Sequence, residues 1–145
     1  MIDFIVRLLL ATFLAGLIGL EREKQEKAAG LRTMMLISLS AALLSIISLN
    51  LPKHIDLVDV PNLRFDVGRI IAYMIAGIGF LGSGIIIKRN NSKKNMVEGL
   101  TTASCLWGVL AIGILCGLNM IELAIITTLL ILGILKMGHS YKKKK

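Results

Sequence analysis

The sequence RIIAYMIAGIGFLGSGIIIK, residues 69–88, decides the fold class. Between its two basic ends lie eighteen uncharged residues, most of them apolar or small. At about 1.5 Å per residue, a helix of that length crosses most of the roughly 30 Å hydrocarbon layer of a bilayer. This stretch therefore predicts a membrane-spanning helix.

The second half of this stretch is crowded with glycine: Gly77, Gly79, Gly82 and Gly84. In water each glycine would cost a helix roughly 1 kcal/mol relative to alanine, whereas in lipid glycine lets a second helix come very close. Residues 77–82 also match the dinucleotide fingerprint G-x-G-x-x-G, which needs a strand before it, a helix after it and an acidic residue about twenty positions on. The run is apolar throughout and the chain lacks strand–helix alternation. We therefore expect close helix packing here and no nucleotide cofactor.

The composition extends this interpretation to the whole chain. Of 145 residues, 55% are hydrophobic, and the mean hydropathy is +0.78. A soluble domain of this size could not bury so much apolar surface. The sequence predicts an all-α polytopic membrane protein with about five spans, at residues 2–20, 33–51, 69–88, 99–118 and 120–137. We expect residues 1–138 to form one transmembrane domain and residues 139–145 a basic cytoplasmic tail.

The connecting segments carry most of the charge and predict the orientation. If the N-terminus lies outside and the C-terminus inside, 13 of the 17 Lys and Arg residues fall on the cytoplasmic side. This is the positive-inside pattern. The net charge of +8 therefore indicates the lipid bilayer as partner, and nucleic acid is not expected. Residues 21–32 form a charged connector, Pro52 is expected to end the second span, and residues 88–98 are expected to form a basic loop.

Polar residues at the predicted inner side are the first candidate site. Glu21, Arg22 and Glu23 end the first span, and Arg32 and Thr33 begin the second. A carboxylate–guanidinium pair between the two helices is one interpretation. A substrate-binding role, or charged helix ends among lipid headgroups, are the alternatives.

The fourth span begins with further polar residues on the same side. Glu98 precedes it, where an acid suits a helix N-terminus, and Thr101 and Thr102 follow. These hydroxyls bond to their own backbone or line a polar seam between the third and fourth spans. That contact would use Gly79, Ser83, Gly99 and Ala103.

On the predicted outer side, Asp66 and Arg69 flank the start of the third span. Asp66 is well placed as its N-cap, and the alternative is a charge pair at the mouth of a cavity. His54, Asp56 and Asp59 lie in the outer loop, where a magnesium sensor is less expected than an ordinary solvated loop. Cys105 and Cys116 share one face of the fourth span, which indicates core packing.

Four sequence blocks, taken together, resemble the MgtC/SapB family of bacterial inner-membrane proteins. They are GLIGLERE at 16–23, AGLRT at 29–33, D-x-x-RI…GIGFLGSG at 66–84 and VEGLTTASCLW at 97–107. The resemblance implies a multi-pass inner-membrane protein linked to survival in low magnesium. Many members carry a C-terminal domain resembling ACT regulatory modules, and we expect this chain, which stops at Lys145, to lack regulation through it.

The sequence shows no nucleophile–base–orienter set, no phosphate loop and no metal-binding motif, so we expect neither enzymatic activity nor a bound metal or cofactor. Two functions stay open. The first is a non-enzymatic protein that binds and modulates another membrane component through glycine-rich helix faces, alone or as a homo-oligomer. The second is a small transporter or channel for Mg²⁺ or another cation. The absence of an ionisable residue in mid-span favours the first.

Overall fold

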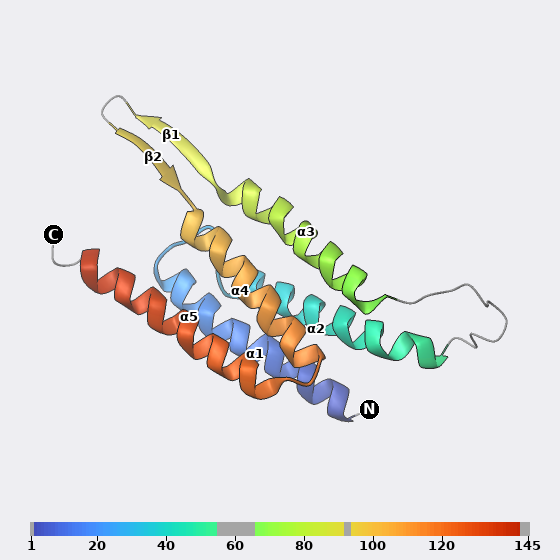
Figure 1. Ribbon diagram of the computed structural model, residues 1–145. Coiled ribbons are helices and arrows are strands. Elements are labelled where there is room, and N and C mark those ends of the chain that lie inside the picture. The colour runs from blue at the N-terminus through green and yellow to red at the C-terminus, as the bar shows by residue number, and fades with distance from the viewer. Residues whose placement is uncertain (1, 55–65, 92–93, 143–145) are drawn as a thin grey trace.

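The computed structural model describes residues 2–54, 66–91 and 94–142 (Figure 1). Within them the chain forms five helices and one two-stranded hairpin. In chain order these are α1 (Ile2–Lys24), α2 (Leu31–His54), α3 (Val67–Ile85), β1 (Ile87–Asn91), β2 (Lys94–Glu98), α4 (Leu100–Gly117) and α5 (Ile121–Lys142). The predicted all-α fold class is confirmed.

The helices have the length and surface of membrane spans. In the described part of the chain, α1, the Leu31–Leu51 segment of α2, α3 and α4 are each long and apolar enough to cross a bilayer. Large apolar side chains also cover the outside: Leu9 is 64% exposed, Phe13 61% and Leu129 64%. Such a surface suits lipid rather than water. The chain is therefore a polytopic membrane protein.

Helices α1, α2 and α4 form the centre of the bundle, because each of them packs against the other two. Helix α5 packs on α4 and α1, and α3 lies along one edge against α4 and α2 (Figure 1). We call the end that holds the α1–α2 turn and the hairpin the inner end, after the predicted orientation. The opposite end, with the α4–α5 turn, is the outer end.

Glycine brings the central helices together. A Cβ added at Gly113 of α4 would collide with the carbonyl oxygen of Ser38 and lie 2.8 Å from the Cβ of Ala41, both on α2. At Gly117, one turn later, it would lie 2.6 Å from the Cβ of Ser45. At Gly19 of α1 it would lie 2.7 Å from the Cα of Leu31. These backbones therefore approach more closely than any side chain would permit.

The predicted packing role of the α3 glycines is largely wrong within one chain. A Cβ added at Gly77, Gly79 or Gly84 would meet no atom within 4 Å among the described residues. At Gly82 it would lie 3.7 Å from the Cβ of Ala103 on α4, an ordinary contact. The reason is the rotation of α3 about its own axis. The face that it turns to the bundle buries only Ile78 and Gly82, and the other glycines lie on its remaining faces.

Three predicted boundaries also need correction. Residues 88–98 were expected to form a loop, but β1 and β2 pair there as an antiparallel hairpin, with Ile87 opposite Glu98 and Asn91 opposite Lys94. Only two residues separate the strands in the sequence, which is the separation that hairpins favour. Helix α2 runs past Pro52 to His54, so the prediction that Pro52 ends this helix is wrong. Helix α5 runs on to Lys142, beyond the expected end at 137.

Candidate functional site

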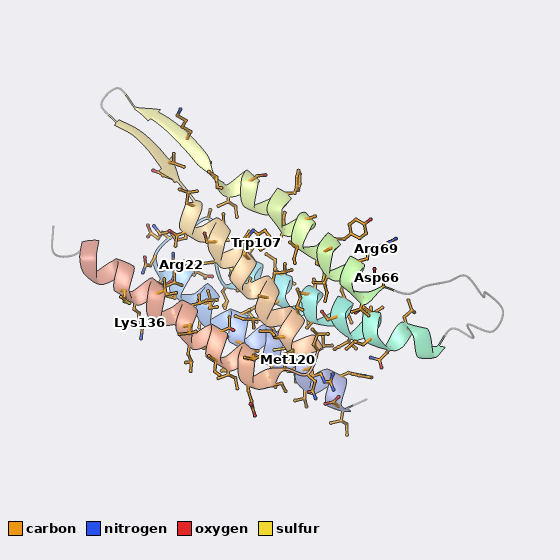
Figure 2. All side chains as sticks on the ribbon, in the orientation of Figure 1. Arg22, Asp66, Arg69, Trp107, Met120 and Lys136 are labelled. Atoms are coloured by element: carbon orange, nitrogen blue, oxygen red, sulfur yellow. The ribbon has the colours of Figure 1, made fainter. Side chains whose placement is uncertain are left out.

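The inner end holds a buried ion pair on α1. Arg22 is only 3% exposed, and its Nε donates to a carboxylate oxygen of the neighbouring Glu21. The other oxygen of Glu21 accepts from Nε2 of Gln25 at 2.7 Å. Figure 2 shows Arg22 at the end of the bundle where α1 stops. A guanidinium this deeply buried is costly unless it is paired, so the pair fixes both side chains.

Glu23 joins the two first helices. Its Oε2 accepts from the backbone N–H of Leu31, the first residue of α2, at 2.8 Å. A carboxylate at that place satisfies one unpaired donor of the helix and suits its positive end. Gly30 fits against the same carboxylate, since an added Cβ would lie 2.8 Å from Oε2. The charged connector therefore builds a compact turn between α1 and α2.

The expected pair between Arg32 and a carboxylate of α1 does not form. Arg32 is exposed and makes no ion pair with the part of the chain that the structure describes, and Thr33 is exposed beside it. The contact between the two helices runs instead from Glu23 to the backbone of Leu31. A backbone N–H at a helix start lies at a fixed position, whereas a long arginine side chain must be ordered to make a pair.

We expect Glu23→Ala to lower the free energy of unfolding by about 1 kcal/mol, because the N–H of Leu31 loses its acceptor. Thermal unfolding in detergent measures this, with Trp107 as the single tryptophan probe. Lys24→Ala is the control, since Lys24 is exposed in the same turn. Equal midpoints for the two variants would contradict the cap.

The start of α4 touches the end of α3 through backbone. Gly99 precedes α4 with φ of 91°, and a Cβ there would collide with the carbonyl oxygen of Ile85. Glycine is required on both counts. Glu98 ends β2, Thr101 is exposed, and Thr102 is buried at 2% exposure. The structure therefore brings Gly99 and Ala103 to the α3–α4 contact, where Gly82 replaces the expected Gly79 and Ser83.

The hydroxyl groups near this contact bond to their own helices. Ser83 donates to the carbonyl oxygen of Phe80 at 2.7 Å, and Ser104 to that of Leu100 at 2.9 Å. Both side chains are exposed. For these two serines the hydroxyl group therefore bonds to its own helix, as hydroxyls in membrane helices often do, whereas a polar seam formed by Thr101 and Thr102 stays a prediction.

The outer end of α3 begins with the predicted cap. The Oδ1 of Asp66 accepts from the backbone N–H of Arg69 at 3.1 Å. The guanidinium of Arg69 forms no ion pair with any described residue, so the alternative charge pair with Asp66 is not made within the chain. Figure 2 shows Arg69 extending away from the other helices. Asp56 and Asp59, and the side chain of His54, lie outside the described residues.

Arg7 is a structural residue that the sequence did not identify as such. Its side chain lies against the outer end of the bundle and is 15% exposed. Nη1 donates to the carbonyl oxygen of Gly117 at 3.2 Å, and Nη2 pairs with Asp3. Arg7 thus satisfies a carbonyl in the last turn of α4, where helices lack internal donors. A contact between residues 110 positions apart leaves no local signal.

Neither cysteine makes a bond that suggests chemistry. Cys105 and Cys116 are both buried on α4 as free thiols, which agrees with a packing role. Among the described residues, no three His, Cys, Asp or Glu side chains are placed to hold a metal ion.

A lateral apolar groove of about 300 Å³ separates α3 from α2. Ser40 contributes the polar part of a lining that is otherwise apolar. The lining residues come from α2, α3 and α4: Leu36, Ile37, Ser40, Ala41, Leu44, Met74, Ile78, Leu81 and Leu110. Helix α3, which buries only Ile78 and Gly82 among its residues, forms one wall of this groove.

The sequence family is decided by a match over nearly the whole chain. Residues 8–144 match the model of the MgtC family. The chain belongs to the MgtC family. Its relatives include a protein of Escherichia coli strain K12 named "Putative magnesium transporter YhiD", which is 39% identical over 139 residues.

Two further members of the family show similar identity. Protein MgtC of Salmonella typhimurium strain 14028s is 39% identical over 132 residues, and Protein SapB of Bacillus subtilis strain 168 is 34% identical over 130 residues. The alignments cover 94%, 91% and 90% of this chain for YhiD, MgtC and SapB, but only 61%, 51% and 54% of those proteins. The chain thus spans about half to three-fifths of these relatives. No solved structure matches it significantly.

Proposed function

We propose that this chain is a non-enzymatic protein of the bacterial inner membrane that acts in magnesium limitation by binding another membrane component. The family and its magnesium-related members support the setting. The observation that favours binding over transport is the tightly packed centre of the bundle.

That centre is made of small and apolar side chains in direct contact. Ala11, Ala15, Ala42 and Ile112 have no exposed surface. The hydroxyl of Ser38, which faces this centre, donates across to the carbonyl oxygen of Ala11 at 3.0 Å. With its side chains packed and its polar group bonded, the α1–α2–α4 core favours a rigid scaffold over a hydrated path through one copy.

The lateral groove is where we place the bound component. It opens between membrane spans, and its lining is apolar apart from Ser40. An apolar helix of another membrane protein fits such a surface, because packing rather than polarity drives association in lipid. Leu81 lines the groove and is still 50% exposed, so it is available for contact.

Transport of Mg²⁺ is the second candidate, since one relative is named as a putative transporter of this ion. Thr102 supports this candidate, because it is a polar residue buried near the α3–α4 contact. A path for Mg²⁺ between α3 and α4 would require α3 to move away from α4, or a second copy of the chain to form the other side of the path.

Flux measurements separate the two candidates. We expect liposomes containing the purified chain to take up Mg²⁺ no faster than empty liposomes, because the core is closed. The same preparation must elute as one species and keep the emission of Trp107, so that a lack of Mg²⁺ uptake cannot result from unfolded protein. Protein-dependent Mg²⁺ uptake that is lost in Thr102→Val would overturn the proposal and favour transport.

Binding has its own positive measurement. A photo-crosslinking amino acid at Leu81 should trap one defined membrane component in cells grown in low magnesium. The same probe at Leu129 of α5, which is 64% exposed, is the matched control. An identical adduct pattern at both positions would mean lipid contact without a specific component.

A further inference from the structure

A second face of α3, distinct from the groove, has no partner in the described chain. At 3.6 residues per turn, the face occupies an arc of about 80°. It points away from Ile78 and Gly82, which α3 buries. We call it the α3 seam; it consists of Asp66, Arg69, Tyr73, Gly77, Phe80 and Gly84.

The seam combines exposed aromatic rings with empty space. Tyr73 is 70% exposed and Phe80 is 79% exposed. A Cβ added at Gly77 or Gly84 would meet nothing within 4 Å among the described residues. Gly113 shows that glycine in this chain can bring two helix backbones into close contact, and Gly77 and Gly84 leave room for the same approach by a helix of another chain.

The spacing of these residues is that of a helix pair. Tyr73, Gly77, Phe80 and Gly84 follow one another at intervals of four, three and four residues. This alternation is the pattern by which side chains of one helix fit between those of its neighbour in a left-handed pair. The rings supply the knobs and the glycines allow the backbones to approach.

Charge at the outer end indicates which helix lies opposite. Asp66 uses Oδ1 to cap its own helix, and the guanidinium of Arg69 makes no ion pair with the described residues. Copies inserted in one orientation are related by a two-fold axis along the membrane normal, so their α3 helices run parallel. Asp66 of one copy then faces Arg69 of the other, twice, in a geometry suited to charge-assisted hydrogen bonds.

We propose that the chain forms a parallel homodimer through the α3 seam. The seam and the groove use different residues of α3. A result that contradicts the dimer therefore does not contradict the binding of another component at the groove, and the reverse also holds. Each copy would keep its groove accessible beside the dimer contact.

Disulfide trapping in native membrane vesicles tests the contact directly. Gly77→Cys and Gly84→Cys are each expected to give a disulfide-linked dimer on mild oxidation, because such a bond needs Cα atoms within about 7 Å. Gly133→Cys on α5 is the matched control, since its added Cβ also meets nothing within 4 Å. The unsubstituted chain, whose Cys105 and Cys116 are buried, sets the background.

Cross-linking at Gly133 as strong as at the seam would reveal random collision and overturn the dimer, as would no cross-linking at any position. Association of labelled copies in liposomes gives a second measurement. Gly77→Leu should weaken it at least tenfold while the emission of Trp107 stays unchanged, because nothing within the chain touches that position. Gly133→Leu should leave association intact. Unchanged association in Gly77→Leu would mean that the seam faces lipid.

Discussion

Replacing Gly113 with leucine is expected to abolish folding of the purified chain, or to lower its free energy of unfolding by about 3 kcal/mol or more. Even the first side-chain carbon would collide with the carbonyl oxygen of Ser38 and lie 2.8 Å from the Cβ of Ala41. Backbone cannot move aside as a flexible side chain can, so α2 and α4 must separate. Their contact is at the centre of the bundle, and its loss opens the core.

The measurement is the fraction of folded protein in a denaturant titration, followed by Trp107 emission and by elution as a single species. Gly133→Leu is the control, because it adds the same side chain to an exposed membrane helix with nothing within 4 Å. We expect this control to change stability by less than 1 kcal/mol. A Gly113→Leu protein as stable as Gly133→Leu would show that α2 and α4 do not approach as the structure has them.

The same glycines show what a sequence can and cannot predict. The principle that small residues mark close helix contacts is correct for Gly113 and Gly117, which lie four residues apart on α4. It was applied to α3, where glycine is densest, and there only Gly82 faces a neighbour. Spacing determines which residues share a face of a helix, but it does not say which face meets another helix.

The contacts of the candidate site also fall into those that the sequence can predict and those that it cannot. The cap at Asp66 was predictable because donor and acceptor are three residues apart. The contacts of Arg7 with Gly117 and of Ser38 with Ala11 were not, because they join residues 110 and 27 positions apart. The fold class depends on hydropathy alone, whereas each of these contacts depends on how the helices are rotated.

Arg22→Ala is expected to lower the free energy of unfolding by about 3 kcal/mol, the second largest effect. Arg22 is 3% exposed, and its removal leaves the carboxylate of Glu21, whose side chain is 16% exposed, without its cation. A cavity the size of the lost side chain adds to the cost. Lys24→Ala is the control for loss of one positive charge in the same turn, since Lys24 is exposed.

A double-mutant cycle separates the charge from the packing. Glu21→Gln together with Arg22→Leu removes both charges and fills much of the volume, and replacing both members of a buried pair is often nearly neutral. The double variant should therefore be more stable than Arg22→Leu alone, by 1 kcal/mol or more. Strictly additive effects would show that Arg22 acts through packing with α1 and its neighbours, and that its pair with Glu21 contributes nothing to holding the inner end of the bundle together.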